Sequence, residues 1–503
     1  MRTEASPDHP ERPDDTERSV RHRWQALSIC LVAAFMTLLD VSIVNVALPS
    51  IRTGLHASPD GLQWILSGYA LTFGLILVPS GRLGDARSRR AVFMAGLVVF
   101  TLASAAAGIA QNIAWLVAAR LVQGVAGGML NPQIAGLIQV MFRGPDRGRA
   151  FGALGATIGI ATAAGPILGG AIIALAGAQE GWRWVFYVNV PVGLIALPLA
   201  WRLLPAPSRA NRPQSLDPIG VLLLGIGVVA LLLPFVQEEQ WHGSGKWLLV
   251  PAAAVLLAAF LWWERRHREP MIDLGLFRRR SYALGSTIAL LYFAGFTAVF
   301  FIFTLYLQNG LRYSALEAGL AITPFAVGSG AAAAVGGRIV SRFGRPLVAV
   351  GLVLVGVGLA GVLLAVHFDS GRQVALATAA PFLVAGLGSG LVIAPNQTIT
   401  LSEVPPEGGG SAAGVLQTGQ RIGTAVGIAA VGAVFFAAVR GTRGGWAVAF
   451  QHGLFVILAF VVAALLAAFA DLLTGRRAVH HPGRHARHHA DRDHAHGHPV
   501  TRG

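Results

Sequence analysis

Apolar runs of about 20 residues recur along the whole 503-residue chain, and each is long enough to cross the hydrocarbon core of a bilayer. Only 13% of the residues are charged, whereas a soluble domain carries about 25%. None of the runs shows the alternation of apolar and polar residues that is typical of membrane-spanning strands. The chain is therefore predicted to be an all-α polytopic membrane protein.

Fourteen apolar segments are predicted to be transmembrane helices. They cover residues 24–48, 62–82, 90–111, 113–135, 149–173, 182–203, 217–236, 246–264, 282–308, 315–337, 346–367, 374–397, 411–437 and 452–473. Residues 1–23 are polar and contain prolines, and are predicted to form a disordered cytoplasmic tail. Residues 474–503 form a second predicted cytoplasmic tail, rich in His and Arg, whose eight histidines show no fixed metal-ligand spacing.

Basic residues are distributed unevenly between the two sets of loops, and this bias predicts the orientation. Nineteen fall in one set: Arg82, Arg87, Arg89, Arg90, Arg143, Arg147, Arg149, Arg202, Arg209, Arg212, Arg265, Arg266, Arg268, Arg278, Arg279, Arg280, Arg338, Arg342 and Arg345. Six fall in the other: Arg52, Lys246, Arg312, Arg372, Arg440 and Arg443. Both termini are therefore predicted to face the cytoplasm, in a multi-pass protein of the cell (inner) membrane. The loop at 398–410 departs from the trend, because it carries Glu403 and Glu407 and no basic residue.

Two loops of the arginine-rich set are similar in sequence. "GRLGDARSRR" at 81–90 aligns with "GRIVSRFGRP" at 337–346, 256 residues later, with Ser341 in place of Asp85. Repeated halves predict two bundles that move about a site near the membrane midplane. We expect an N-terminal six-helix bundle at 24–203 and a C-terminal one at 282–473. Residues 204–281 have no counterpart in the repeat, and are predicted to form a linker with two additional transmembrane helices.

Asp40 is the only charged residue between Trp24 and Arg52. An ionised Asp at the centre of a span costs about 2.5–3.5 kcal/mol on insertion scales, so such residues face a partner or a water-filled path. A carboxyl there could take a proton from one side of the membrane and release it on the other. The alternative is a carboxylate that only hydrogen-bonds a helix neighbour such as Ser42 or Asn45.

Arg120 interrupts the apolar run at 113–135 and is the natural counterpart of Asp40. An arginine stays charged, so its approach or withdrawal would change how readily Asp40 binds a proton. We therefore expect the pair to couple protonation to conformation. A snorkelling arginine near the membrane boundary is the alternative explanation.

Several motifs together resemble a known family. "GRLGDARSRR" resembles the helix 2–3 signature of the major facilitator superfamily, and "RLVQGVAGG" at 120–128 resembles its helix 4 motif. "AAGPILGG" at 163–170 is similar to the antiporter motif of helix 5. "TLLDVSIVNVALP" at 37–49 and "WRWVFYVNVPVG" at 182–193 resemble the fourteen-helix drug/proton antiporters of EmrB/QacA type. The resemblance covers roughly residues 24–473.

The resemblance implies a major facilitator fold of two pseudo-symmetric six-helix bundles plus two inserted central helices. It implies a proton-coupled exporter of lipophilic drugs, antibiotics or related small molecules, with Asp40 and Arg120 as the proton-coupling pair. It also implies a gating loop at Gly81, Asp85, Arg89 and Arg90, and an antiporter motif at Gly165, Pro166, Gly169 and Gly170. Ser88 departs from the family pattern, because a glycine is expected there. The turn is then tighter, or the contact that Asp85 makes to close the gate is weaker.

The sequence says least about the substrate. Residues predicted to line the pocket are Asn45, Tyr69, Gln123, Tyr292, Phe296 and Asn396. The aromatic residues of 282–308 could stack flat lipophilic molecules, or they could form a stripe that faces lipid or the core. We expect a small lipophilic substrate, protons and the bilayer as partners, no nucleic acid, and a functional monomer.

No G-x-x-x-x-G-K-[ST] motif is present, so ATP-driven export by this chain is excluded. The expected driving force is the proton gradient, with no cofactor and no metal. Three other classes stay open: a proton-coupled symporter or exporter of a specific metabolite or lipid, a non-transporting membrane sensor, and a membrane enzyme. The enzyme is disfavoured, since the spans hold no clustered nucleophile or metal site; no enzymatic activity is expected.

Overall fold

The computed structural model describes residues 13–177, 179–206, 217–236, 243–267, 270–369, 371–442 and 445–479. The α-helices are α1 (Pro13–Leu55), α2 (Pro59–Leu83), α3 (Arg89–Gly108), α4 (Ile113–Met141), α5 (Gly144–Ala176), α6 (Gly181–Tyr187), α7 (Asn189–Leu203), α8 (Pro218–Val236), α9 (Leu249–Glu264), α10 (Arg280–Leu305), α11 (Ala315–Phe343), α12 (Arg345–Phe368), α13 (Val374–Thr400), α14 (Gly409–Gly441) and α15 (Trp446–Val479). A π-helical turn, η1 (Gly84–Ser88), joins α2 to α3, and a second, η4 (Tyr306–Gly310), extends α10. Three short 3₁₀ turns, η2 (Ser244–Leu248), η3 (Leu274–Arg278) and η5 (Pro406–Gly408), complete the described elements.

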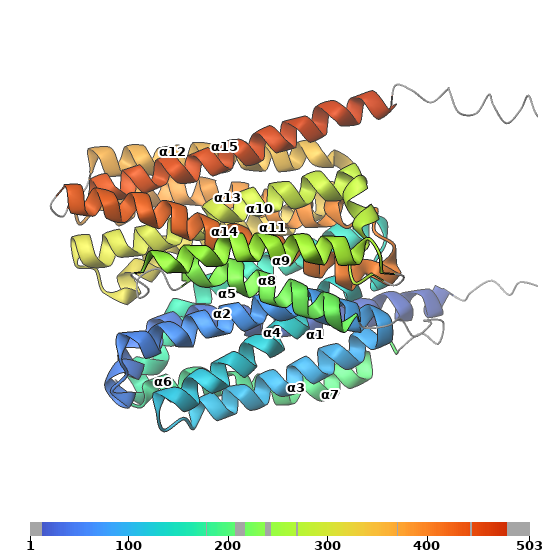
Figure 1. The fold of residues 1–503 in the computed structure, drawn as a ribbon, viewed down its shortest axis with the longest axis horizontal. Helices are drawn as coiled ribbons and strands as arrows, with labels where there is room; N and C mark the ends of the chain where they lie inside the picture. The colour runs from blue at the N-terminus through green and yellow to red at the C-terminus, as the bar shows by residue number, and fades with distance from the viewer. Residues whose placement is uncertain are drawn as a thin grey trace, which may run out of the picture.

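The helices form two bundles, α1–α7 and α10–α15, which lie side by side (Figure 1). The inserted helices α8 and α9 lie against the seam between the bundles. Leu71 and Val78 of α2, Ala425 of α14 and Leu224 and Val228 of α8 belong to one buried hydrophobic cluster. The inserted pair therefore covers α2 and α14 on one side.

The first described residues of α1 and the last of α15 lie at the same end of the molecule (Figure 1). The α2–α3 turn, the start of α5 and the starts of α10, α12 and α14 lie at this end too, because successive long helices run antiparallel. We call it the arginine-rich end, since its turns carry Arg87, Arg89, Arg147, Arg279 and Arg345.

Twelve helical segments of the described residues are long and apolar enough to cross a membrane, which does not confirm the predicted count of fourteen. One of the twelve, Asp60–Gly108, contains both α2 and α3, because η1 directly adjoins both helices, although the chain turns at the extended Ser88 between them. The apolar part of α8, Pro218–Pro234, is shorter than the other segments. The predicted segment at 182–203 is broken at Val188 into α6 and α7.

Both chain ends contain more helix than expected, since α15 continues to Val479, into the predicted tail at 474–503. Helix α1 begins at Pro13, so part of the predicted N-terminal tail continues the first transmembrane helix as a helix. Residues 1–12 and the histidine-rich stretch at 480–503 lie outside the described residues.

The halves meet most closely along α5 and α11. A Cβ on Gly337 would stand 2.5 Å from the Cα of Gly152, and one on Gly148 would stand 2.6 Å from the carbonyl oxygen of Gly337. Farther along the same pair, a Cβ on Gly159 would stand 2.8 Å from the backbone nitrogen of Gly330. Small residues are therefore required for these two backbones to approach so closely.

Candidate functional site

Asp40 lies within the N-terminal bundle, fully buried, and forms an ion pair with Arg120. Arg120 Nη1 donates to Asp40 Oδ2 at 2.5 Å. On the other carboxylate oxygen, Gln123 Nε2 donates at 2.8 Å and Asn189 Nδ2 at 3.1 Å. The structure thus brings the two predicted coupling residues together, although they are 80 residues apart in the chain.

Arg120 is held on several sides. Its Nε donates to the carbonyl of Ile65 at 3.2 Å, and Nη1 also donates to Gln123 Oε1 at 2.8 Å. Its guanidinium lies 4.2 Å above the ring of Tyr69. Arg120 is only 1% exposed, so the alternative of an arginine that snorkels to the membrane surface does not apply to this conformation.

Local helix geometry explains how these side chains meet. Arg120 and Gln123 are three residues apart on α4 and therefore share one face. Asn189 is the first residue of α7, directly after the break at Val188, and this break points its amide at the carboxyl. Ser104 of α3 accepts a hydrogen bond from Gln123 at 2.7 Å. Sequence reasoning missed Asn189 and Ser104, although Asn189 lies inside the quoted motif at 182–193.

The antiporter motif lies next to this network, between the bundles. A Cβ on Gly165 would overlap Ser42, two residues after Asp40, and one on Gly169 would stand 2.9 Å from Ile43. On the opposite side of α5, Pro166 contacts Gly319 of α11. A Cβ on Gly170 would stand 3.6 Å from Leu316 of α11, an ordinary van der Waals contact. Helix α5 therefore touches both the helix that carries Asp40 and the other half of the molecule.

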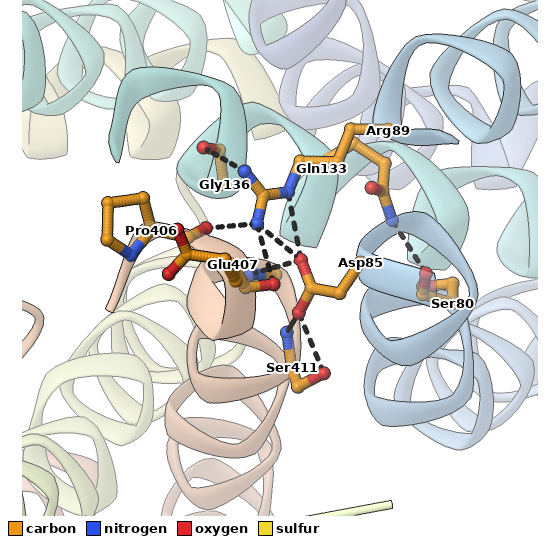
Figure 2. Close-up of polar contacts among 9 residues, drawn as sticks. Ser80, Asp85, Arg89, Gln133, Gly136, Pro406, Glu407 and Ser411 are labelled. Atoms are coloured by element: carbon orange, nitrogen blue, oxygen red, sulfur yellow. Dashed lines mark hydrogen bonds and ion pairs between the residues drawn. The ribbon is translucent and has the colours of Figure 1, made fainter. Parts of the chain in front are cut away.

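A second polar cluster joins the two halves at the arginine-rich end (Figure 2). The Asp85 carboxylate accepts hydrogen bonds from Gly410 N at 3.1 Å, from Ser411 N at 2.7 Å and from Ser411 Oγ at 2.8 Å. Gly409 and Gly410 begin α14, so the carboxylate satisfies free N–H groups at the positive end of that helix. We call the contact between Asp85, Arg89 and the start of α14 the latch.

Arg89 completes the latch. It donates to Asp85 Oδ1 through Nε at 2.9 Å and Nη2 at 2.6 Å. Its other donors reach carbonyl oxygens, those of Gly136 at 3.1 Å and Glu407 at 3.1 Å and that of Pro406 (Figure 2). One guanidinium therefore connects α4 and the η5–α14 segment to the acid on the α2–α3 turn.

The loop at 398–410, which departs from the arginine bias, receives polar groups from the opposite half. Gln139 Nε2 donates to the carbonyl of Leu401 at 3.0 Å, and Arg147 Nη1 to that of Ser402 at 3.4 Å. Arg279 of its own half donates to the carbonyl of Glu403. Main-chain carbonyls of this loop are therefore bound by side chains from both halves.

Ser88 and Arg90 of the predicted gating loop have roles within their own half, whereas Gly81 contacts the opposite one. Ser88 is in an extended conformation, with φ −165°, and its hydroxyl accepts the Ala91 N–H as the N-cap of α3. Arg90 donates to the carbonyls of Trp201 and Leu204 and lies 4.7 Å over the ring of Trp201. Arg90 thus fastens α3 to α7 within one half and is outside the latch. Gly81 lies so close to α14 that a Cβ would overlap the Gly410 carbonyl.

The six predicted pocket residues lie in different places. Tyr69 and Gln123 belong to the network around Asp40. Asn45 is exposed on α1 and donates to the carbonyl of Val41 at 3.1 Å. Asn396 of α13 is buried and donates to the carbonyl of Gly285 at 2.9 Å.

Tyr292 and Phe296 lie together on α10, with ring centroids 5.5 Å apart. Phe296 also contacts Phe300 of α10 and Phe325 of α11, whereas Phe303 is buried against Phe382. The aromatic stripe is thus partly core. Its role in binding, like that of the other four residues, stays a prediction.

Buried acids that the sequence reasoning did not single out lie at the arginine-rich end. Asp471 of α15 pairs with Arg280 at 2.8 Å and with Arg345, the repeat counterpart of Arg89. Asp217 accepts a hydrogen bond from Trp263 at 2.8 Å, and Glu264 accepts one from Ile272 N at 3.1 Å. Within the residues that the structure describes, no group of three or more His, Cys, Asp or Glu side chains could hold a metal ion.

An all-helical chain with two bundles, a buried ion pair inside one of them and a polar latch between them belongs to the class of polytopic membrane transporters. The family model of the Major Facilitator Superfamily matches residues 30–428. The chain belongs to this superfamily, as the motifs predicted.

Among curated proteins, the chain is 38% identical to the "Probable actinorhodin transporter" of Streptomyces coelicolor, over 82% of this chain and 72% of that protein. It is 35% identical to the "Tetracenomycin C resistance and export protein" of Streptomyces glaucescens, over 81% of this chain and 75% of that protein. Among solved structures, the human organic anion transporter MFSD10 matches with a TM-score of 0.66 at 15% identity, over 89% of this chain and 99% of that one, which shows a shared fold. These similarities indicate a transporter rather than an enzyme.

Proposed function

We propose that this chain is a proton-coupled secondary active exporter of lipophilic drugs, antibiotics or related small molecules, of the fourteen-helix drug/proton antiporter type. The observation that carries the proposal is the buried Asp40 carboxylate, which is held by an arginine that can only be a cation. Relatives named as antibiotic transporters and as resistance and export proteins support the direction of transport and the kind of substrate.

In this proposal Asp40 carries the proton. While Arg120 lies 2.5 Å away, the Asp40 carboxylate has a counter-ion. A proton that enters from outside neutralises Asp40 and leaves Arg120 without its counter-ion. The network of Gln123, Ser104 and Asn189 then rearranges, and the bundles move relative to one another. Release of the proton on the inside restores the pair and resets the transporter.

The arginine-rich end is, in this proposal, the cytoplasmic end, with both termini in the cytoplasm and the protein in the cell membrane. The excess of arginine in these loops supports that orientation. The latch then closes the cytoplasmic side in the conformation described above. Breaking it is required before a substrate can enter from the cytoplasm.

We further propose fourteen membrane crossings. Helices α2 and α3 reverse direction at η1 and would each cross once. Helix α8 has 19 residues, about 28 Å of helix, which is close to the thickness of the hydrocarbon core. It would cross as a hairpin with α9. The transporter would act as a monomer, with the proton gradient as its only energy source and no cofactor.

The test begins with a resistance screen across chemically varied antimicrobials, in cells that express the native protein or Asp40→Asn. Compounds that the native protein removes are then added to inside-out vesicles that hold a proton gradient, and the gradient is followed with a pH-sensitive dye. We expect these compounds to dissipate the gradient with the native protein, not with Asp40→Asn, and partly with Asp40→Glu.

Asp146→Asn is the matched control, because this acid is exposed and its one ion pair among the described residues is with the neighbouring Arg149. It should behave like the native protein. An Asp40→Asn protein that still exchanges substrate for protons would contradict the assignment of Asp40 as the proton carrier.

A further inference from the structure

Arg421 of α14 is a second intramembrane arginine that the function proposed above does not use. It lies twelve residues after the first residue of α14, about 18 Å along a helix of about 50 Å. It shares a helix face with Gly410 and Gly414, and a Cβ on Gly414 would stand 2.7 Å from the Leu77 carbonyl of α2. Arg421 is thus on the side of α14 that faces the N-terminal bundle.

The guanidinium of Arg421 lies 4.4 Å over the ring of Phe73, which belongs to the opposite half. It makes no ion pair and no hydrogen bond with the part of the chain that the structure describes, and its side chain is exposed. The outer side of this seam is covered by α8, through the cluster that contains Val78, Leu224 and Ala425. The surface that Arg421 exposes therefore lies between the halves.

Unused hydrogen-bonding groups surround Arg421. Gln417, one turn earlier on the same face, has an unpartnered Oε1, and the Thr418 hydroxyl has no partner among the described residues. Across the seam, the Tyr69 hydroxyl is buried and likewise has no partner there. Buried hydroxyl and amide groups are normally satisfied, so these groups indicate a place for a polar ligand.

Arg421 makes the space around these unpartnered groups positively charged. A cation inside a membrane protein pairs with a counter-charge or faces a water-filled cavity, and Asp40 already pairs with Arg120. A guanidinium binds a carboxylate through two parallel hydrogen bonds, and the face of an aromatic ring beneath it leaves its edge free to do so. The Tyr69 hydroxyl could donate to the same anion.

This place is also connected to the proton site. The ring of Phe73 stacks on that of Tyr69, with centroids 5.9 Å apart, and Tyr69 lies beneath Arg120. Arg421, Phe73, Tyr69 and Arg120 therefore form a continuous stack that ends at Asp40. An anion at Arg421 and a proton at Asp40 would act on opposite ends of it.

We propose that Arg421 recognises the acidic group of the substrate, so that the transporter selects lipophilic molecules that carry a carboxylate or phenolate. This inference rests on the proposed export function and narrows its substrate class. Phe73 and Tyr69 supply the aromatic surface for the body of the molecule, and Arg421 supplies the charge.

Fluorescein and rhodamine 123 test this proposal, because they share a xanthene skeleton while fluorescein is an anion and rhodamine 123 a cation at neutral pH. Transport of each dye is measured in proteoliposomes under an imposed proton gradient. We expect the native protein to move fluorescein in preference to rhodamine 123. Arg421→Gln should lower fluorescein transport at least about 10-fold and abolish the preference for fluorescein over rhodamine 123. Arg421→Lys should retain part of the fluorescein transport and part of this preference.

Arg440→Gln is the matched control, an exposed arginine in the last turn of the same helix, and should leave both fluxes unchanged. Identical elution of all variants on size exclusion shows that they are folded. If Arg421→Gln elutes differently, Arg421→Lys replaces it in the comparison. Equal loss of fluorescein and rhodamine 123 transport in Arg421→Lys then overturns the proposal. Native protein that does not move fluorescein, or fluorescein transport that survives in Arg421→Gln, also overturns it. Transport of rhodamine 123 alone, coupled to protons and lost in Asp40→Asn, would keep the exporter and reject only the anion site.

Discussion

Arg120 reaches its hydrogen-bond acceptors with a flat, forked group that a lysine cannot reproduce. It donates to the Asp40 carboxylate, to the Gln123 amide oxygen and to the Ile65 carbonyl while its flat face covers Tyr69. A lysine would keep the charge and lose the fork of donors and the stacking. At the scale of single residues, the network therefore depends on shape as well as on charge.

The stability of the Asp40–Arg120 pair gives the first prediction. Arg120→Ala leaves a buried carboxylate without its counter-ion, so we expect a loss of about 3–5 kcal/mol of unfolding free energy. Arg120→Lys should lose less. The double variant Asp40→Asn/Arg120→Ala should be more stable than Arg120→Ala and yet inactive in proton exchange. Thermal unfolding in detergent measures all three.

The control for this series is Arg149→Ala. Arg149 pairs with Asp146 at 3.0 Å, but both side chains are about half exposed, so its removal should change stability by less than about 1 kcal/mol. Equal stability of Arg120→Ala and the double variant would mean that the buried charges do not depend on each other.

At the scale of elements, α2 and α14 are joined by the latch. Asp85→Asn keeps the size of the side chain but removes the charge that binds Arg89 and the N-terminus of α14. Charge-assisted hydrogen bonds are about twice as strong as neutral ones, so we expect the arginine-rich end to open more often. Spin labels at Arg87→Cys and Glu407→Cys, both exposed positions on opposite halves, would report a longer distance population.

The chain suits this measurement, because Cys30 is its only cysteine and is buried. Cys30→Ala gives a background without other thiols. Asp60→Asn, an acid in the first turn of α2 at the opposite end, should leave the distance distribution unchanged. A distribution that is identical in Asp85→Asn and the native protein would show that the latch does not hold this end closed.

The close contact between α5 and α11 predicts that a larger side chain there lowers stability. Gly337→Val would place side-chain atoms against the backbone of Gly152, only 2.5 Å from the new Cβ, and overpacking of this kind costs about 1–3 kcal/mol or more. Gly356→Val, on α12, meets its nearest side chain only at 3.9 Å and should be nearly neutral. Thermal unfolding compares the two, and similar melting temperatures would contradict the tight seam.

At the scale of the whole molecule, export of an anion has an electrical consequence. One proton moving in and one monoanion moving out transfer two charges, whereas a neutral substrate transfers one. Each charge gains about 2.3 kcal/mol per 100 mV, so the accumulation of an anionic substrate should respond to the membrane potential about twice as steeply, on a logarithmic scale. Vesicles with a potassium diffusion potential and no pH gradient measure this slope, and equal slopes for acidic and neutral substrates would contradict it.

The sequence predicted those parts of the site in which the residue type itself is unusual for its surroundings. Two isolated charges in apolar runs located Asp40 and Arg120, and the resemblance of the loop at 81–90 to the family signature located Asp85. It did not predict Asn189 and Ser104 as partners in the Asp40 network, because a neutral polar residue in a helix carries no signal of what it faces. Arg421 was missed because its significance depends on which side of α14 meets α2.

The main-chain acceptors of the segment 401–407 were also invisible in the sequence, although Arg89, Gln139 and Arg147 all donate to its carbonyl oxygens. A carbonyl group is present whatever side chain its residue carries, even at Pro406. Exposed side chains along 401–407 can therefore diverge by mutation without undoing the closure, whereas Leu401 and Val404 are buried in a hydrophobic cluster. This segment is a suitable place to substitute exposed residues such as Glu403 with reporter groups, at little cost to the working cycle.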